Sequence, residues 1–139
     1  MTYLGIDFGT KRLGLAVSDE HGALALPLQA ITKTTNDDLL SRIEQVVHER
    51  KIQAVVVGLP LSLRGERTLT SRQAENFARK IEGRLSLPVY LTDEACTSAE
   101  AEEKLKEAGI SGKRRKEYLD SQAAVEILEG FLRQTAADR

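Results

Sequence analysis

The chain has 139 residues, near the commonest size of a single domain, so we expect one domain over residues 1–139. Hydrophobic residues make up 41% and charged residues 29%, a composition that excludes a disordered chain. The formal net charge is −1, so affinity for nucleic acid must come from local basic patches. No apolar run approaches the roughly 18 residues of a membrane helix, and one cysteine, Cys96, excludes an internal disulfide. We expect a cytoplasmic protein with no membrane partner.

Three antiparallel strands are predicted at the start of the chain. Residues 4–8 (LGIDF) and 13–19 (LGLAVSD) are apolar runs joined by a turn over 9–12. Residues 23–31 (ALALPLQAI) are a third strand, in which Pro27 favours a sheet edge or a bulge.

Helices and strands alternate in the rest of the chain. Asn36 or Asp37 caps a helix that runs to Arg50. Thr70 and Gln73 form a capping box for a helix near 71–85. The other predicted elements are a strand over 54–60 buried on both faces, a strand over 88–94, a helix from the Thr97–Glu100 capping box to Gly109, and a last helix over 114–133.

This order, βββαβαβα with one more helix before the last, predicts an α/β fold. Hairpin strands followed by parallel crossover strands give a mixed five-stranded sheet with helices on both faces. Ligands of such sheets usually bind beyond the carboxyl ends of the parallel strands.

Acidic residues occur at three separated places, two of them in apolar surroundings. Asp7 lies inside an apolar strand, where an unpaired charge costs several kcal/mol. Asp120 projects from the apolar stripe of the last helix. Asp93 and Glu94 end a strand where a ligand is expected. The stripe consists of Leu119, Ala123, Ala124, Ile127, Leu128, Phe131 and Leu132.

A hard divalent cation would explain these acids together, because Mg²⁺ and Mn²⁺ take oxygen ligands and offset the repulsion between carboxylates. Two such ions, about 3.5–4 Å apart, would clamp the attacking and leaving oxygens of a phosphodiester hydrolysis. Structural roles are the alternative: Asp7 bonded to loop amides, Asp120 paired with Lys116 or placed at the helix N-terminus, and Asp93 or Glu94 as a cap. Strand alternation puts Asp93 and Glu94 on opposite faces and leaves open which of them shares the face of Asp7.

Basic residues close to these acids could hold a phosphate backbone. The candidates are Lys11, Arg12, Arg64, Lys113, Arg114, Arg115 and Lys116, with Arg67 and Arg72 as further cations. A solvated charged face is the alternative for each. Because 4% of the residues are aromatic and Trp is absent, contacts to phosphates are favoured over base stacking. His21 and His48 are expected on the surface, and Cys96 as a small buried or helix-entry residue.

Four motifs resemble, in this order, the YqgF/RuvX family of the ribonuclease H-like superfamily, and they cover nearly the whole chain. They are LGIDFGTKRLGLAVSD, VVVGLPLSLRGERT, PVYLTDEACTSAEAEEKL and KEYLDSQAAVEILEGFL. Members of that family are called pre-16S rRNA nucleases or Holliday junction resolvases. The resemblance implies a ribonuclease H-like fold and an acidic site at Asp7, at Asp93–Glu94 (with Glu94 preferred) and at Asp120.

Two departures from the family pattern are visible. Ala95 and Cys96 stand where the family usually has an arginine, and Ser62 and Leu63 stand where a polar pair is usual. The metal-binding acids are intact, whereas substrate contacts by the missing arginine are not expected.

The sequence therefore favours a nuclease that uses Mg²⁺ or Mn²⁺, with two ions, and processes the 5′ end of precursor 16S rRNA. A Holliday junction resolvase acting on four-way DNA is the alternative within this class, and it would need a dimer; the sequence leaves monomer and homodimer open. The DxGT motif also resembles the phosphate loop of actin-like ATPases, but 139 residues supply only one of the two domains that those proteins need. A non-catalytic RNA-binding assembly factor is the third class.

Overall fold

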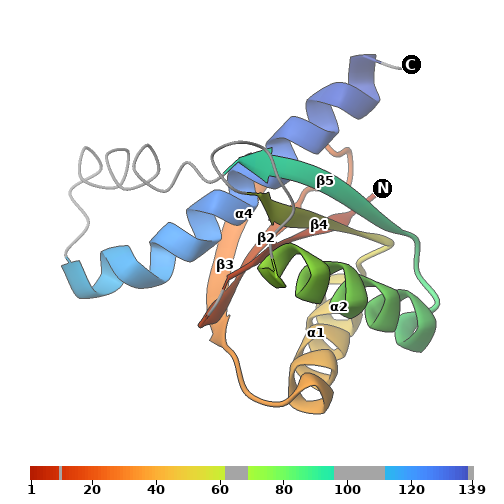
Figure 1. Ribbon diagram of the computed structural model, residues 1–139. Helices are drawn as coiled ribbons and strands as arrows, with labels where there is room; N and C mark the ends of the chain where they lie inside the picture. Colours follow the sequence, from red (N-terminus) through yellow and green to blue (C-terminus); the bar gives the residue numbers. More distant parts are fainter. Residues whose placement is uncertain (10, 62–68, 96–111, 138–139) are drawn as a thin grey trace.

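A five-stranded mixed sheet lies at the centre of the protein in the computed structural model, with helices on both faces (Figure 1). The structure describes residues 1–9, 11–61, 69–95 and 112–137; within these, the side chains of 60, 61, 70, 93–95, 112–120, 136 and 137 are outside the description. The strands are ordered β3-β2-β1-β4-β5. Their bounds are β1 Tyr3–Phe8, β2 Arg12–Ser18, β3 Ala25–Thr32, β4 Ala54–Leu61 and β5 Val89–Ala95.

The first three strands form the predicted antiparallel meander. In the β1–β2 turn the amide of Gly9 donates to the carbonyl of Arg12 at 3.1 Å. A Cβ on Gly9 would lie 2.6 Å from that carbonyl oxygen, so the tight turn requires glycine. The third strand is at the sheet edge, as Pro27 predicts, and the pairing with β2 shifts register between Leu13 and Leu15.

Helix α1 spans Asn36–Arg50, and the structure corrects its predicted cap. Thr35 is the N-cap, because its hydroxyl oxygen accepts a hydrogen bond from the Asp38 amide at 3.2 Å, which makes Asn36 the first helical residue. Helix α2 spans Leu69–Leu85. It begins before Thr70, so Thr70 lies inside the helix and the predicted capping box is wrong.

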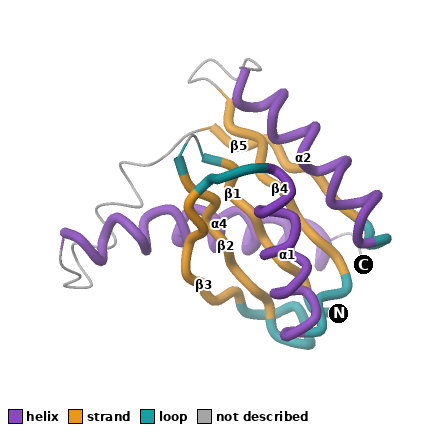
Figure 2. Tube along the Cα trace, turned by 90° about the horizontal axis from the view of Figure 1, so that it is seen from below, coloured by secondary structure: helices purple, strands orange, loops and turns teal. Residues whose placement is uncertain are grey.

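Helix α4 spans Gly112–Ala137, longer at both ends than predicted. The predicted helix between Thr97 and Gly109 lies outside the described residues. Figures 1 and 2 show α1 and α2 on one face of the sheet and α4 crossing the other. Because β4 is covered on both sides, its residues 54–59 are buried on both faces, as the apolar run over 54–60 predicts.

Strand alternation divides the core into two clusters. Leu4, Ile6 and Phe8 face α1 and α2, together with Val55 and Val57. The other strand face packs on α4 through Tyr3, Ala16, Ala54, Val56, Ala124, Val125, Ile127, Leu128 and Leu132. Val125 is also buried, although the predicted apolar stripe omits it. The buried surface of α4 is therefore wider than that stripe.

Glycines allow α4 to lie close to the sheet. A Cβ on Gly5 would come within 2.9 Å of the Leu128 Cβ and 3.1 Å of the Ala124 carbonyl oxygen. A Cβ on Gly58 would collide with the Ile127 side chain. Larger residues at either position would therefore push the helix off β1 and β4.

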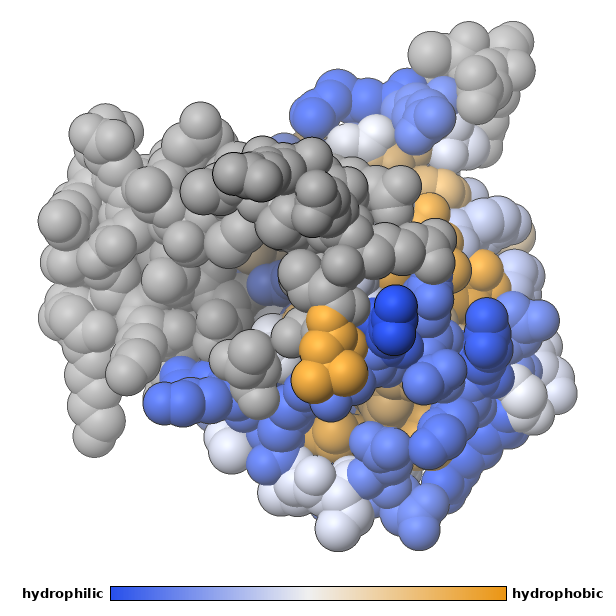
Figure 3. All heavy atoms as spheres, in the orientation of Figure 1, coloured by the Kyte–Doolittle hydropathy of each residue, from blue (hydrophilic) through white to orange (hydrophobic). Residues whose placement is uncertain are grey.

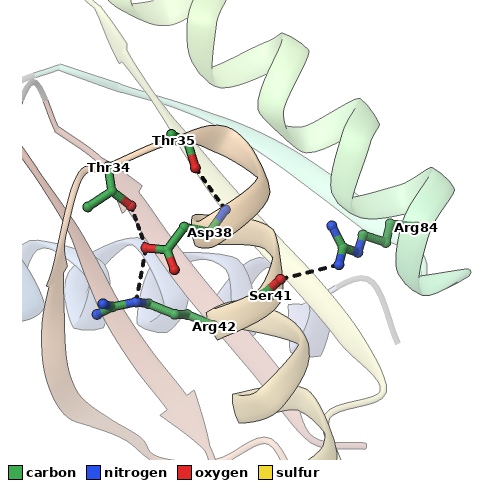
Figure 4. Close-up of polar contacts among 6 residues, drawn as sticks. All are labelled: Thr34, Thr35, Asp38, Ser41, Arg42 and Arg84. Carbon is green, nitrogen blue, oxygen red and sulfur yellow. Dashed lines mark hydrogen bonds and ion pairs between the residues drawn. The ribbon is translucent and has the colours of Figure 1, made fainter.

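The surface over α1 and α2 is mostly hydrophilic, with separate apolar patches (Figure 3). Polar contacts also join the two helices. Arg84 donates to the Ser41 hydroxyl at 3.3 Å (Figure 4). It also pairs with Glu44 at 3.5 Å. Within the described ranges, no helix has the length and apolar character needed to cross a membrane.

Candidate active site

Asp7 is a half-buried carboxylate near the carboxyl end of β1. It is in register with Gly14 of β2 on one side and with Gly58 of β4 on the other. Directly paired residues share a sheet face, and the odd-numbered residues of β1 face α4. Asp7 therefore lies on the α4 face between two residues without side chains, at the sheet end where ligands of this kind of fold bind.

The register of β5 separates the two neighbouring acids. Tyr90 contacts Phe131 of α4, with ring centroids 5.1 Å apart, so this strand position faces α4. Thr92 has the same parity and is paired with Gly58, which is itself paired with Asp7. Alternate residues of a strand share a face, so position 94, paired with Pro60, is on the α4 face together with Tyr90 and Thr92. Position 93, paired with Leu59, is on the opposite face together with Leu91. The side chains of both acids lie outside the described residues.

Helix α4 brings the backbone of Asp120 to the same face. The hydroxyl of Ser121 donates to the Leu28 carbonyl of β3, and farther along the helix Ala124 and Ile127 approach Gly5 and Gly58. The helix thus crosses the sheet from β3 toward β4, and position 120 lies at the start of this crossing. The Asp120 side chain is outside the described residues.

Sequence reasoning missed Thr92. Its Oγ1 is buried and has no hydrogen-bond partner within the described part of the chain. A buried hydroxyl without a partner costs free energy, so its presence beside Gly58 is unusual for a purely structural residue. The sequence marks Thr92 only as the last residue before the Asp93–Glu94 pair.

Two of the predicted basic residues border this site in the described structure. Lys11 is exposed in the β1–β2 turn, and Arg12 is half-buried at the start of β2. Arg12 is two residues before Gly14 in β2, so it is on the same sheet face as Gly14 and its partner Asp7. Arg64 lies outside the described residues, as do the side chains of Lys113, Arg114, Arg115 and Lys116.

Sequence reasoning also missed Lys33, whose amide donates to the Lys11 carbonyl at 2.9 Å. Its Nζ lies 3.8 Å from the centroid of the Phe8 ring. Burial lowers the pKa of the Lys33 ammonium. The residue precedes α1 in a polar stretch, and nothing in the sequence shows that it folds back onto Phe8.

Other polar residues singled out in the sequence are His21, His48, Ser62 and Cys96. His21 and His48 are exposed, as expected. Cys96 and Ser62 lie outside the described residues.

Magnesium and manganese ions prefer oxygen ligands, and the Asp7 carboxylate has oxygens of that kind. Among the residues that the structure describes, no group of three or more histidine, cysteine or acidic side chains could hold a metal. A complete ligand set would therefore need Asp7 together with acids whose side chains lie outside the description. Their backbone positions, on β5 and α4, fit that requirement.

Comparison with known proteins gives a consistent result. A sequence model described as "RuvX: Holliday junction resolvase" matches residues 1–134. A protein of Maridesulfovibrio salexigens named "Putative pre-16S rRNA nuclease" is 49% identical over 132 residues, which cover 95% of this chain and 98% of the relative. A protein of the same name from Lawsonia intracellularis is 39% identical over 139 residues, which cover 100% and 98%.

Two solved structures share the fold. Thermus thermophilus RuvC, in complex with a Holliday junction substrate, has a TM-score of 0.59 at 17% identity, with 98% of this chain and 96% of that chain covered. The fowlpox virus resolvase, in complex with Holliday junction DNA, has a TM-score of 0.59 at 8% identity, with 97% and 99% covered. These likenesses confirm the expected ribonuclease H-like fold.

Proposed function

Because the chain belongs to the RuvX family, a family of nucleases, we propose that it is a metal-dependent nuclease that processes the 5′ end of precursor 16S ribosomal RNA. The observation that carries the proposal is the position of Asp7. This half-buried carboxylate lies in the middle of the sheet, near the carboxyl end of its strand and between Gly14 and Gly58, where ligands of this kind of fold bind. The substrate is proposed from the names of relatives that share 39–49% of their residues with this chain.

Asp7, Glu94 and Asp120 are the proposed metal ligands and catalytic acids. Strand parity favours Glu94 over Asp93, because position 94 belongs to the face of Asp7 and position 93 to the opposite face. Asp120 completes the set from α4, the helix that covers this face.

The carboxylates would hold two Mg²⁺ or Mn²⁺ ions, which supply a polarised water and charge stabilisation for phosphodiester hydrolysis. The remaining work belongs to the chain. Arg12, on the face of Asp7, would bind a backbone phosphate, and Lys11 would bind the next one along the strand. Arg64 and the Lys113–Lys116 run would extend this contact.

A second candidate is cleavage of four-way DNA junctions, which the family description favours. A junction presents two symmetric strands, so this activity requires two sites in a homodimer. Cleavage of RNA can proceed at the single site of a monomer. We propose one domain that acts in the cytoplasm on structured RNA, as a monomer or a homodimer.

The deciding experiment compares two substrates under the same conditions. Purified protein with Mg²⁺ or Mn²⁺ is incubated with the 5′ region of precursor 16S rRNA or with a four-way DNA junction. We expect cleavage of the RNA that stops on addition of EDTA. Faster cleavage of the junction would favour the resolvase, and tight RNA binding without cleavage would favour an assembly factor. ATP hydrolysis without nucleic acid would revive the ATPase alternative.

A direct test of the ligand set is a crystal soaked in Mn²⁺. Anomalous density between Asp7, Glu94 and Asp120 is expected. Density beside Asp93 instead of Glu94 would contradict the assignment from strand parity.

A further inference from the structure

A cavity of about 290 Å³ opens on the α1–α2 face of the sheet, opposite the face of Asp7. We call it the Lys33 pocket. It lies between the segment that enters α1 and the helix α2, and its volume is near the lower end for ligand sites. It is lined by Phe8, Lys33, Thr34, Asn36, Leu39, Gln73, Asn76, Phe77 and Lys80.

The lining has the chemistry of an anion site. Lys33 and Lys80 supply two positive charges, and three amide side chains supply further donors, while no carboxylate among the described residues lines the pocket. The base of the pocket is apolar, since Phe8, Leu39 and Phe77 are buried core residues. An anion bound over this base would be partly desolvated, which strengthens its attraction to the lysines.

One acid in the first turn of α1, Asp38, is already engaged. Asp38 accepts a hydrogen bond from the Thr34 hydroxyl at 2.5 Å and pairs with Arg42 at 3.3 Å (Figure 4). The Asp38 carboxylate is thereby held by Thr34 and Arg42. The same contacts fix the segment that carries Lys33.

Lys33 has no ion pair within the described part of the chain. Its contacts are the face of the Phe8 ring, 3.8 Å away, and the backbone bond to Lys11. Burial lowers the pKa of Lys33, so keeping its charge there costs free energy. A bound anion would offset that cost, whereas packing alone would be served by an apolar side chain.

The pocket is close to the candidate active site along the chain and in the fold. Phe8 directly follows Asp7 at the end of β1, and Lys33 is bonded to the turn that carries Lys11. Arg12, Lys11, Lys33 and Lys80 thus form a series of cations that leads from the Asp7 face over the end of β1 to the opposite face.

We propose that the Lys33 pocket binds a backbone phosphate of the nucleic-acid substrate, away from the phosphodiester that is cut. The inference rests on the proposed function. A strand held at Asp7 would pass over the carboxyl end of β1 and place a phosphate between Lys33, Lys80 and the side-chain amides of Asn36 and Asn76. The contact positions the strand without reading its sequence.

The test uses binding, so that it is separate from cleavage. Fluorescence anisotropy of a labelled RNA from the 5′ region of precursor 16S rRNA is measured over a salt series, with EDTA present. The proteins compared are wild type, Lys33→Gln, Asn76→Asp and the control Lys51→Gln. Lys51 is an exposed lysine after α1, at the opposite end of the sheet. We expect Lys33→Gln to weaken binding roughly ten-fold at low salt and to reduce the slope of log K against log salt by about 1. Asn76→Asp, which adds a carboxylate, should weaken binding at least as much, and Lys51→Gln should leave both quantities near wild type.

A second arm identifies the source of the phosphate. Inorganic phosphate and a mononucleotide are titrated while the side-chain NMR signals of Lys33 and Asn76 are followed. Shifts with the RNA, together with a raised Lys33 pKa in the complex, support the proposal. Shifts with free phosphate but unchanged RNA affinity in Lys33→Gln would overturn it in favour of a free-phosphate site.

Failure of this inference is distinguishable from failure of the proposed function. If wild type cleaves RNA and Lys33→Gln keeps the wild-type affinity and salt slope, the pocket proposal is wrong and the nuclease proposal stands. If Lys33→Gln loses RNA binding but wild type shows no metal-dependent cleavage, the pocket proposal stands and the nuclease proposal is wrong. Thermal unfolding of each variant excludes a trivial loss of fold.

Discussion

Ile127 of α4 packs directly over Gly58 of β4, on the sheet face of Asp7. A Cβ at position 58 would collide with the Ile127 Cδ1 and would lie 3.0 Å from its Cγ1 and 3.3 Å from its Cγ2. Because Gly58 has no side chain, the helix that carries Asp120 can lie close to β4, the strand beside Asp7.

We predict that Gly58→Ala destabilises the fold by about 1–3 kcal/mol, because Ile127 must move. Ile127→Val removes the atom that collides first, at a cost of about 0.5–1.5 kcal/mol by itself. The double variant should be more stable than the sum of the two single changes, as measured by urea unfolding in a double-mutant cycle.

Gly83→Ala in α2 is the matched control, because a Cβ there meets nothing within 4 Å. It should be neutral or stabilising by up to about 1 kcal/mol. Equal destabilisation by both glycine substitutions would contradict the packing argument.

Thr92→Val should stabilise the protein by about 1 kcal/mol. The Thr92 Oγ1 is buried without a hydrogen-bond partner among the described residues, and valine replaces the hydroxyl by a methyl group of similar size. The melting temperature measures the effect. Thr32→Val, at an exposed position of the edge strand, is the control and should change stability by less than about 0.5 kcal/mol. A clear loss of stability in Thr92→Val would show that the hydroxyl has a structural partner.

Asp7→Asn should reduce metal-dependent cleavage by at least about 100-fold, because the proposed site loses a charged oxygen ligand. The shape of the side chain is retained, so the fold should be intact, or more stable since repulsion between neighbouring acids falls. Cleavage rates and circular dichroism are measured together. Asp37→Asn, an exposed acid of α1, serves as the control. A wild-type rate in Asp7→Asn would exclude Asp7 from the mechanism.

The turn between β2 and β3 should weaken in acid. Asp19 Oδ1 accepts hydrogen bonds from the amides of Ala23 at 2.7 Å and Leu24 at 3.0 Å. The Leu24 amide is the main cause that lowers the pKa of Asp19 below 3.8, with further contributions from Ala23, Asp19's own amide and His21, against a smaller opposing effect of burial.

Because the folded pKa lies below the unfolded value, the stabilisation by the Asp19 carboxylate is fully present above about pH 5 and is lost as the pH falls through the folded pKa. The difference in unfolding free energy between wild type and Asp19→Asn should therefore shrink toward zero below pH 3.8. An NMR titration in which the Asp19 carboxyl changes charge at or above 3.8 would show that the amides do not stabilise its charged form.

Periodicity was sufficient for the order of the described elements, because the strand and helix periods differ and Gly or Pro separates the elements. It failed at helix starts. Asn36, Asp37 and Thr35 are all good caps, and only the backbone at Thr35 decides which hydroxyl or carboxyl reaches an amide. The predicted cap at Thr70 is wrong for a similar reason, because the helix already begins at Leu69.

By itself the sequence determined the α/β order, the edge position of the Pro27 strand and the unusual setting of Asp7, because these follow from local patterns of apolar and charged residues. Only the tertiary structure decided which residues meet. The register of β4 against β5 places position 94, and not 93, on the face of Asp7, and the return of Lys33 onto Phe8 creates the Lys33 pocket. Strand register and loop return are set by packing between segments far apart in the chain, which no local pattern contains.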